Sequence, residues 1–138
     1  MMKPFHMTNL HRPGKSVLIF AGVLFFDQLF KAYFRSIGTY YENYGALFGY
    51  PVPAPIPSIA FILLVISVTF LISKSRRIDI FLIPFALIFS GILSNSIDRV
   101  KEGYVIDYIL AGNLFAFNLA DLAIACGSAI FIWRIIEE

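Results

Sequence analysis

The chain has 138 residues, of which 59% belong to the hydrophobic set and 14% are charged. Soluble domains carry about 45–50% apolar and about 25% charged residues, so this composition excludes a water-soluble domain and indicates a protein dissolved in lipid. The length accommodates a single domain, which we assign to residues 1–138. The net charge of +2 is too small and too dispersed to indicate nucleic-acid binding.

Four apolar segments follow one another along the chain, over about residues 16–34, 57–73, 78–97 and 115–136. Each approaches the roughly 20 residues that a helix needs to cross a bilayer. The first segment carries Asp27, Gln28 and Lys31 near its end and has no small-residue cleavage site, so we do not expect a cleavable signal peptide. The sequence therefore predicts an all-α membrane protein, a bundle of four transmembrane helices.

Lysine and arginine residues predict the orientation of the bundle. They gather before the first segment and between the second and third: Lys3, Arg12, Lys15, Lys74, Arg76 and Arg77. By the positive-inside rule, the N-terminus, the 74–77 link and the C-terminus face the cytoplasm. The links over about residues 35–56 and 98–114 then face the outside.

The two outer links are rich in aromatic and β-branched residues with glycine punctuation. Residues 40–49 and 103–108 show this pattern, and prolines between 51 and 57 stop any helix before the second span. Such segments are typical of short strands at the membrane interface. We expect a small extracytoplasmic β-rich cradle above the four helices.

Polar side chains within the apolar segments are expensive and need a partner or a function. Asp27 and Lys31 stand four apart on one face of the first helix. Two further pairs stand three apart, at the end of the third span and the start of the fourth: Asn95 with Asp98, and Asn118 with Asp121. With Asp107 and Arg99 from the adjacent outer link, all of them are predicted to lie in one layer toward the outer leaflet.

The residue types in this layer point to acid–base chemistry. His6 and His11 lie in the N-terminal arm, and Cys126 sits in an apolar run where a small buried residue is expected. We therefore expect no serine–histidine or cysteine–histidine nucleophile, no metal site and no cofactor. Two neighbouring carboxylates share one proton, so one can activate water while the other donates to a carbonyl, as in aspartic proteases.

The residues alone leave other interpretations open. Asp27 and Lys31 are explained better by an intrahelical ion pair than by direct catalysis. Asp98 with Arg99 is explained equally well by an interfacial salt bridge at a helix end and by substrate contact, and Asp98 is the alternative catalytic residue. Asn118 is placed to cap the fourth helix. A proton-relay subunit or small transporter would also bury such groups, although a layer near one face makes no path across the membrane. Spacing does not choose the catalytic pair among the four carboxylates.

Five motifs, in order, resemble those of the lipoprotein signal peptidase (signal peptidase II) family. They are Asp-Gln-Leu-Phe-Lys at 27–31, Asn-Tyr-Gly-Ala-Leu-Phe-Gly at 43–49, Asn-Ser-Ile-Asp-Arg at 95–99, Gly-Tyr-Val-Ile-Asp-Tyr at 103–108 and Phe-Asn-Leu-Ala-Asp at 117–121. The family's catalytic aspartates fall on Asp107 and Asp121. Its substrate-binding or supporting positions fall on Asp27, Lys31, Asn43, Gly45, Asn95, Asp98, Arg99 and Asn118.

The resemblance implies an activity, a partner and a location. The expected reaction removes signal peptides from bacterial prolipoproteins, cutting before a cysteine that carries a diacylglyceryl group. The expected partners are that substrate and membrane lipid, in the bacterial inner membrane, with the active site toward the periplasmic face.

The chain departs from the family pattern at several positions. The link over residues 108–116 is short, Ala116 replaces a usual proline, and Ser94 replaces a usual glycine before Asn95. Phe30 stands where serine or threonine is usual, and Leu47 where a small residue is usual. These changes keep a specialised or non-catalytic paralogue open, although both aspartates are retained.

Overall fold

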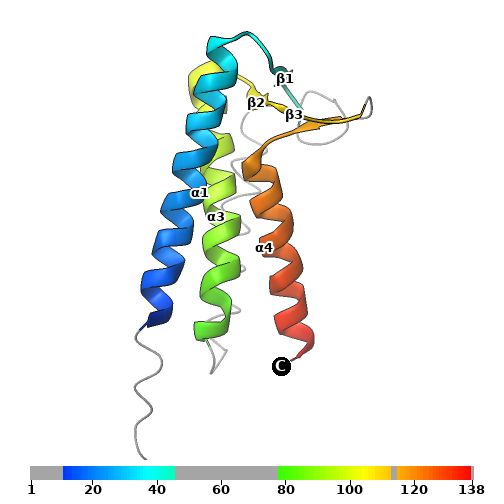
Figure 1. The fold of residues 1–138 in the computed structure, drawn as a ribbon. Coiled ribbons are helices and arrows are strands. Elements are labelled where there is room, and N and C mark those ends of the chain that lie inside the picture. The colour runs from blue at the N-terminus through cyan, green and yellow to red at the C-terminus, as the bar shows by residue number, and fades with distance from the viewer. Residues whose placement is uncertain (1–10, 46–77, 113–114, 138) are drawn as a thin grey trace, which may run out of the picture.

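Three long helices lie side by side in the computed structural model, which describes residues 11–45, 78–112 and 115–137 (Figure 1). They are α1 (His11–Ser36), α3 (Leu82–Glu102) and α4 (Leu119–Ile136), and a short 3₁₀ turn, η2 (Ile78–Phe81), precedes α3. By length and composition, these three helices can each cross a membrane. The span predicted over residues 57–73 lies outside the described residues.

Helix α3 is the central helix of the described bundle. It packs against both α1 and α4, and half of its most apolar window is buried, against 11% for α1 and 17% for α4. Helices α1 and α3 run in the same direction and α4 runs back (Figure 1). The end of α1, the end of α3 and the start of α4 therefore meet at one end of the bundle.

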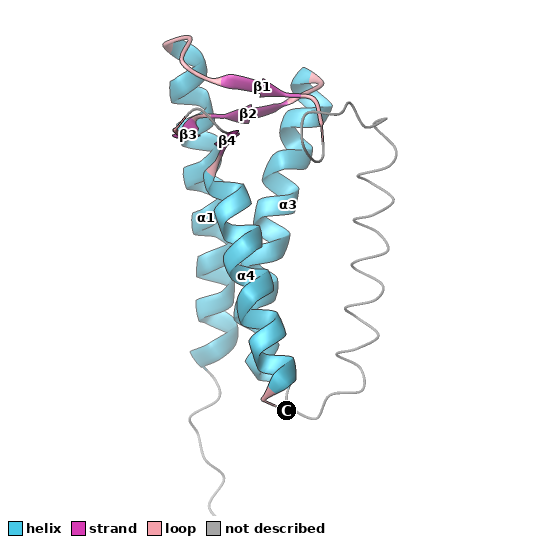
Figure 2. Cartoon of the chain, turned by 90° about the vertical axis from the view of Figure 1, so that its right-hand side faces the viewer, coloured by secondary structure: helices cyan, strands magenta, loops and turns pink. Residues whose placement is uncertain are grey.

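Short strands lie at this end (Figure 2). β1 (Tyr41–Asn43) pairs antiparallel with β2 (Val105–Asp107), and β3 (Ile109–Ala111) pairs antiparallel with β4 (Phe115–Phe117). All three residues of β2 are buried. The strands predicted within residues 40–49 and 103–108 are thus present as β1 and β2, whereas the sheet of β3 and β4 was not predicted.

The helix boundaries differ from the predicted ones at two places. The fourth span was expected to begin at residue 115, but residues 115–117 form β4 and the helix begins after Asn118. The third span was expected to end at residue 97, but α3 continues to Glu102 and stops at Gly103, whose φ of 84° suits glycine. Asp98 and Arg99 consequently lie on a helix rather than in a link.

Two glycines allow α3 and α4 to approach closely. A Cβ on Gly91 would collide with the carbonyl oxygen of Ala120, and a Cβ on Gly127 would lie 2.8 Å from the carbonyl oxygen of Pro84. Small residues at such crossings let backbones pack in lipid, where no hydrophobic effect draws helices together. The start of α4 is thereby held against the middle of α3.

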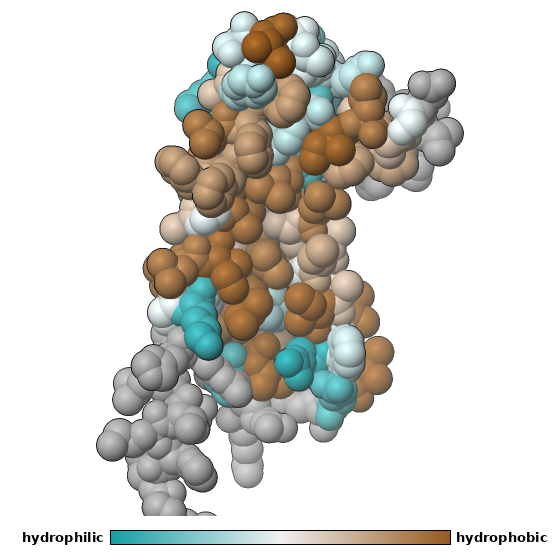
Figure 3. Space-filling view, in the orientation of Figure 1, coloured by the Kyte–Doolittle hydropathy of each residue, from teal (hydrophilic) through white to brown (hydrophobic). Residues whose placement is uncertain are grey.

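The outer surface of the bundle is apolar around its middle and polar toward its ends (Figure 3). Large hydrophobic side chains are exposed on α1 and α4, among them Phe25, Leu29 and Ile132. Such a band matches the hydrocarbon core of a bilayer. The interior toward the strand end, in contrast, contains the buried polar side chains.

Candidate active site

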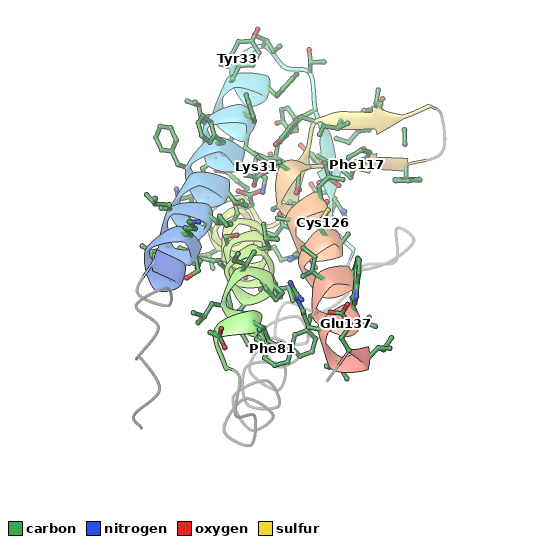
Figure 4. All side chains as sticks on the ribbon, turned by 60° about the horizontal axis from the view of Figure 1, so that its bottom comes forward. Lys31, Tyr33, Phe81, Phe117, Cys126 and Glu137 are labelled. Atoms are coloured by element: carbon green, nitrogen blue, oxygen red, sulfur yellow. The ribbon has the colours of Figure 1, made fainter. Side chains whose placement is uncertain are left out.

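Lys31 lies in the interior where the helices meet (Figure 4). Its Nζ is 2.7 Å from Asp27 Oδ2, 2.7 Å from Asp98 Oδ2 and 2.9 Å from Asn95 Oδ1. An ammonium group has three donors, so all of them are used, and the side chain is only 2% exposed. We call Asp27, Lys31 and Asp98 the buried ion cluster.

Asp27 connects α1 to α3, to the start of α4 and to Tyr108. Its Oδ2 accepts from Ser94 Oγ at 2.6 Å, and its Oδ1 accepts from the Tyr108 hydroxyl at 2.9 Å and from the backbone N–H of Ala120 at 3.1 Å. The residue is 0% exposed. The predicted ion pair with Lys31 is confirmed, but it is one part of a larger network.

Asp98 belongs to the buried ion cluster, and both of its carboxylate oxygens accept hydrogen bonds. Its Oδ1 accepts from Gln28 Nε2 at 3.0 Å, and its Oδ2 accepts from the backbone N–H of Ile106 as well as from Lys31. The predicted interfacial pair of Asp98 with Arg99 is wrong, because the ion-pair partner is Lys31. Arg99 is half-buried, and within the described ranges its guanidinium forms no ion pair.

Asp107 stands at the end of β2 and is 2% exposed. Its Oδ1 accepts from Asn118 Nδ2 at 2.7 Å, and its Oδ2 accepts from Asn43 Nδ2 at 2.9 Å. Gly45 donates its backbone N–H to Asn43 Oδ1 at 3.0 Å, which orients that amide. Gly45 therefore contributes to the site through Asn43.

Asp121 lies in the first turn of α4 and is half-buried. Its Oδ1 accepts from Asn95 Nδ2 at 2.9 Å, and its Oδ2 accepts from the backbone N–H of Asn118 at 3.2 Å. The Asn118 side chain accepts in return from the Asp121 N–H, which completes a capping box. The predicted cap at Asn118 is confirmed. We call Asp107 and Asp121 the aspartate pair.

Asn95 joins the aspartate pair to the buried ion cluster. Its Oδ1 accepts from Lys31 and from Asn118 Nδ2, and its Nδ2 donates to Asp121. Apart from Arg99, the predicted polar layer is therefore a single hydrogen-bonded network in the part of the chain that the structure describes. In this network four carboxylates lie around one ammonium group.

The two members of the aspartate pair lie in different electrostatic surroundings. Burial raises the pKa of Asp107 from 3.8 to about 6, the negative charge of Asp121 adds to the rise, and hydrogen bonds from Asn43 and Asn118 oppose it. Asp121 lies at the N-terminal end of α4, where the helix dipole stabilises a negative charge. The two environments are thus unequal, as acid and base roles require.

Three side chains of the network were not among the predicted site residues. They are Gln28, Ser94 and Tyr108, which hydrogen-bond Asp98 or Asp27. Burial and the charge of Asp27 raise the pKa of the Tyr108 hydroxyl above 10.0, so it remains protonated and donates. Their positions beside Asp27, Asn95 and Asp107 in the sequence were the available signal.

The predicted burial of Cys126 is wrong, because the residue is exposed on α4. Across residues 11–45, 78–112 and 115–137, no three His, Cys, Asp or Glu side chains are grouped to hold a metal ion.

Comparisons with known proteins agree with this arrangement. The family model described as "Signal peptidase (SPase) II" matches residues 19–137. The lipoprotein signal peptidase of Pelodictyon phaeoclathratiforme is 33% identical over 108 residues, which make up 68% of this chain and 64% of that protein. The lipoprotein signal peptidase of Chlorobium phaeobacteroides (strain BS1) is 37% identical over 109 residues, 68% of each chain. The chain thus spans about two thirds of the length of these curated relatives.

Solved structures share the fold. A bacterial membrane enzyme determined by the in meso method at 2.3 Å has a TM-score of 0.76 and 26% identity, covering 99% of this chain and 93% of that chain. Another, at 1.9 Å, has a TM-score of 0.74 and 26% identity, covering 100% of this chain and 99% of that chain. By the family match over residues 19–137, this chain belongs to the signal peptidase II family.

Proposed function

We propose that the protein is a membrane aspartyl endopeptidase that removes signal peptides from diacylglyceryl-modified bacterial prolipoproteins, cutting before the lipidated cysteine. Asp107 and Asp121 are the catalytic pair. This choice depends on one observation, which is that the four carboxylates have different binding partners. Asp27 and Asp98 both bind the ammonium group of Lys31. Asp107 and Asp121 instead accept from neutral amides, which hold a carboxylate in place and leave it free to exchange protons.

The unequal environments assign the roles within the pair. Asp121 is the more accessible carboxylate and lies at the positive end of a helix dipole, so it is assigned the role of general base. Asp107 is buried, and its pKa is raised to about 6, so it holds a proton more readily than a free aspartate does and is assigned the role of general acid. The pair as a whole shares one proton.

The reaction then follows in two proton-balanced steps. Asp121 takes a proton from water as the water oxygen attacks the scissile carbonyl carbon, and Asp107 gives its proton to the carbonyl oxygen. In the second step, Asp121 returns its proton to the amide nitrogen while the carbon–nitrogen bond breaks. One hydroxyl proton of the intermediate passes to Asp107, so that the free acid and amine leave and the starting protonation is restored.

The position of the aspartate pair suits a lipid-anchored substrate. The pair lies at the strand end of the bundle, and the described start of α1 and the C-terminus lie at the other end (Figure 1). With the N- and C-termini in the cytoplasm, as the basic residues predict, the pair faces the periplasmic side of the inner membrane. A diacylglyceryl group in the outer leaflet would then present its cysteine at this level.

We also propose the fourth crossing over residues 57–73. Helices α1 and α3 run in the same direction, so the end of α1 and the start of α3 lie at opposite ends of the bundle. The apolar composition of residues 57–73 supports a span there.

The test is a cleavage assay with purified protein in detergent and a diacylglyceryl-modified prolipoprotein. A shortened product is expected from the wild type, and near-total loss from folded Asp107→Asn and Asp121→Asn. Glu42→Gln is the matched control, because Glu42 is an exposed carboxylate of β1 outside the network, and it should cut like the wild type. Activity of either Asn variant at the wild-type rate overturns the catalytic pair, and loss of wild-type activity with a chelator overturns the metal-free mechanism.

A further inference from the structure

The first turn of α4 is held from outside the helix. Helix starts leave backbone N–H groups without intrahelical partners. Here the Leu119 N–H donates to the Tyr108 hydroxyl at 3.1 Å, and the Ala120 N–H donates to Asp27 Oδ1 at 3.1 Å. The next N–H, that of Asp121, is capped by Asn118. Two of these three partners, the Tyr108 hydroxyl and the Asp27 carboxylate, lie outside α4 and its cap. We call these two contacts the tether of α4.

The Tyr108 hydroxyl is the centre of this tether. It donates to Asp27 Oδ1 at 2.9 Å while it accepts from Leu119. Its ring stacks on Phe34 of α1 with a centroid separation of 5.0 Å and an interplanar angle of 6°. Tyr108 directly follows Asp107, and Leu119 lies two residues before Asp121. A single hydroxyl thus connects α1 to the strand end that carries one aspartate and to the helix start that carries the other.

We propose that the Tyr108 hydroxyl is a positioning group that sets the placement of Asp107 relative to Asp121 by fixing both of their segments to Asp27. The proposal rests on the proposed peptidase function, because the placement matters only if the two aspartates act together. Acid–base catalysis by a pair requires both carboxylates within hydrogen-bond reach of one substrate group. Misplacement by about 1 Å can lower a rate about a hundredfold.

The stacked ring and the hydroxyl can be separated by substitution. Tyr108→Phe keeps the ring against Phe34 and removes only the oxygen, which leaves the Leu119 N–H without that partner in a partly buried site. Tyr104→Phe is the control. It removes a hydroxyl from the residue directly before β2, and that hydroxyl contacts the Tyr40 hydroxyl. Ser94→Ala removes the other hydroxyl bound to Asp27, on Oδ2, which makes no contact with α4.

The first measurement is steady-state kinetics on a lipidated prolipoprotein. Tyr108→Phe should lower kcat about tenfold to a hundredfold with KM changed by less than about twofold. Tyr104→Phe should leave kcat unchanged, and Ser94→Ala should lower it less than Tyr108→Phe. An unchanged kcat in Tyr108→Phe, or a fall that only follows loss of folded protein in detergent, overturns the proposal.

The second measurement does not depend on activity. Amide hydrogen exchange at Leu119 should be faster in Tyr108→Phe than in the wild type and unchanged in Tyr104→Phe. Equal exchange at Leu119 in all three proteins overturns the tether. If the wild-type enzyme cleaves no lipoprotein, the proposed function fails, and exchange at Leu119 still decides whether the tether exists.

Discussion

The side chain of Asn118 donates a 2.7 Å hydrogen bond from its amide nitrogen to Asp107. Its amide oxygen accepts the backbone N–H of Asp121 at 2.9 Å, and the residue is completely buried. One short side chain therefore contacts both members of the aspartate pair. The length of the Asn118 side chain therefore sets the separation between the end of β2 and the start of α4.

Asn118→Ser separates the two contacts of Asn118. Serine keeps an oxygen for the N-terminal cap of α4 but cannot reach Asp107 with an amide donor. We expect a loss of stability of about 1–3 kcal/mol, because buried acceptors lose their amide donor, and a fall in kcat of about tenfold or more, because Asp107 loses an orienting hydrogen bond. Asn118→Ala is the control, and removal of the cap as well should cost about 1 kcal/mol more. Thermal unfolding in detergent and cleavage kinetics measure the two effects, and wild-type kcat in Asn118→Ser would contradict the expectation.

The pH–rate profile should report the proton on Asp107. In the proposed cycle Asp107 starts protonated, and its pKa is raised to about 6 by burial. As pH rises through this value the active form is lost, so kcat/KM should fall on the alkaline side with an apparent pKa near 6 that belongs to the pair. The measurement is kcat/KM against pH in detergent, and a flat profile between about pH 5 and pH 8 would rule out the assignment.

Asn43→Ala should shift the pH–rate profile in a predictable direction. The Asn43 amide stabilises the ionised carboxylate and lowers the pKa of Asp107, so its removal raises that pKa further. The alkaline limb of the variant should therefore move to higher pH than that of the wild type. A shift to lower pH would show that Asn43 does not act on Asp107 through this bond.

Local spacing predicted those contacts that depend on a single element. Asp27 and Lys31 are four apart, so an α-helix alone brings them together, and Asn118 caps the helix that it precedes. The shared depth of the polar groups followed from the order of the spans. These features required only helical geometry and the alternation of sides in a membrane.

Contacts between elements could not be read in the same way. Asp98 and Arg99 are adjacent in sequence, but adjacent helical residues do not face each other, and only Asp98 points at Lys31. The strand over residues 115–117 merges with the apolar start of α4, and a short apolar run does not distinguish strand from helix. The partners of Ser94 and Tyr108 depend on how α1 is rotated against α3 and α4, which no spacing encodes.

Lys31→Met should be among the most destabilising substitutions in the described chain. It leaves Asp27 and Asp98 buried without their cation, and removal of one partner from a buried ion pair costs about 3–5 kcal/mol. Arg35→Met is the matched control, because Arg35 pairs with Glu102 at an exposed position, where such pairs contribute about 0–1 kcal/mol. Thermal unfolding in detergent compares the two. Equal losses would show that the buried ion cluster is not the stabilising centre of the bundle.

Gly91→Ala tests whether the close approach of α3 and α4 places Asp121. A methyl group on Gly91 would collide with the Ala120 carbonyl oxygen and lie 2.7 Å from Ile124 Cγ1. The start of α4 must then move, which should cost about 1–3 kcal/mol and lower kcat, because Ala120 precedes Asp121.

Gly22→Ala is the control for Gly91→Ala, since a Cβ at Gly22 on α1 would meet nothing within 4 Å. Alanine is also the better helix former, by about 1 kcal/mol, so this variant should be as stable as the wild type or more so, with unchanged kcat. Unfolding temperature and cleavage rate are measured for both. If Gly91→Ala behaves like Gly22→Ala, the position of Asp121 does not depend on the contact between α3 and the start of α4.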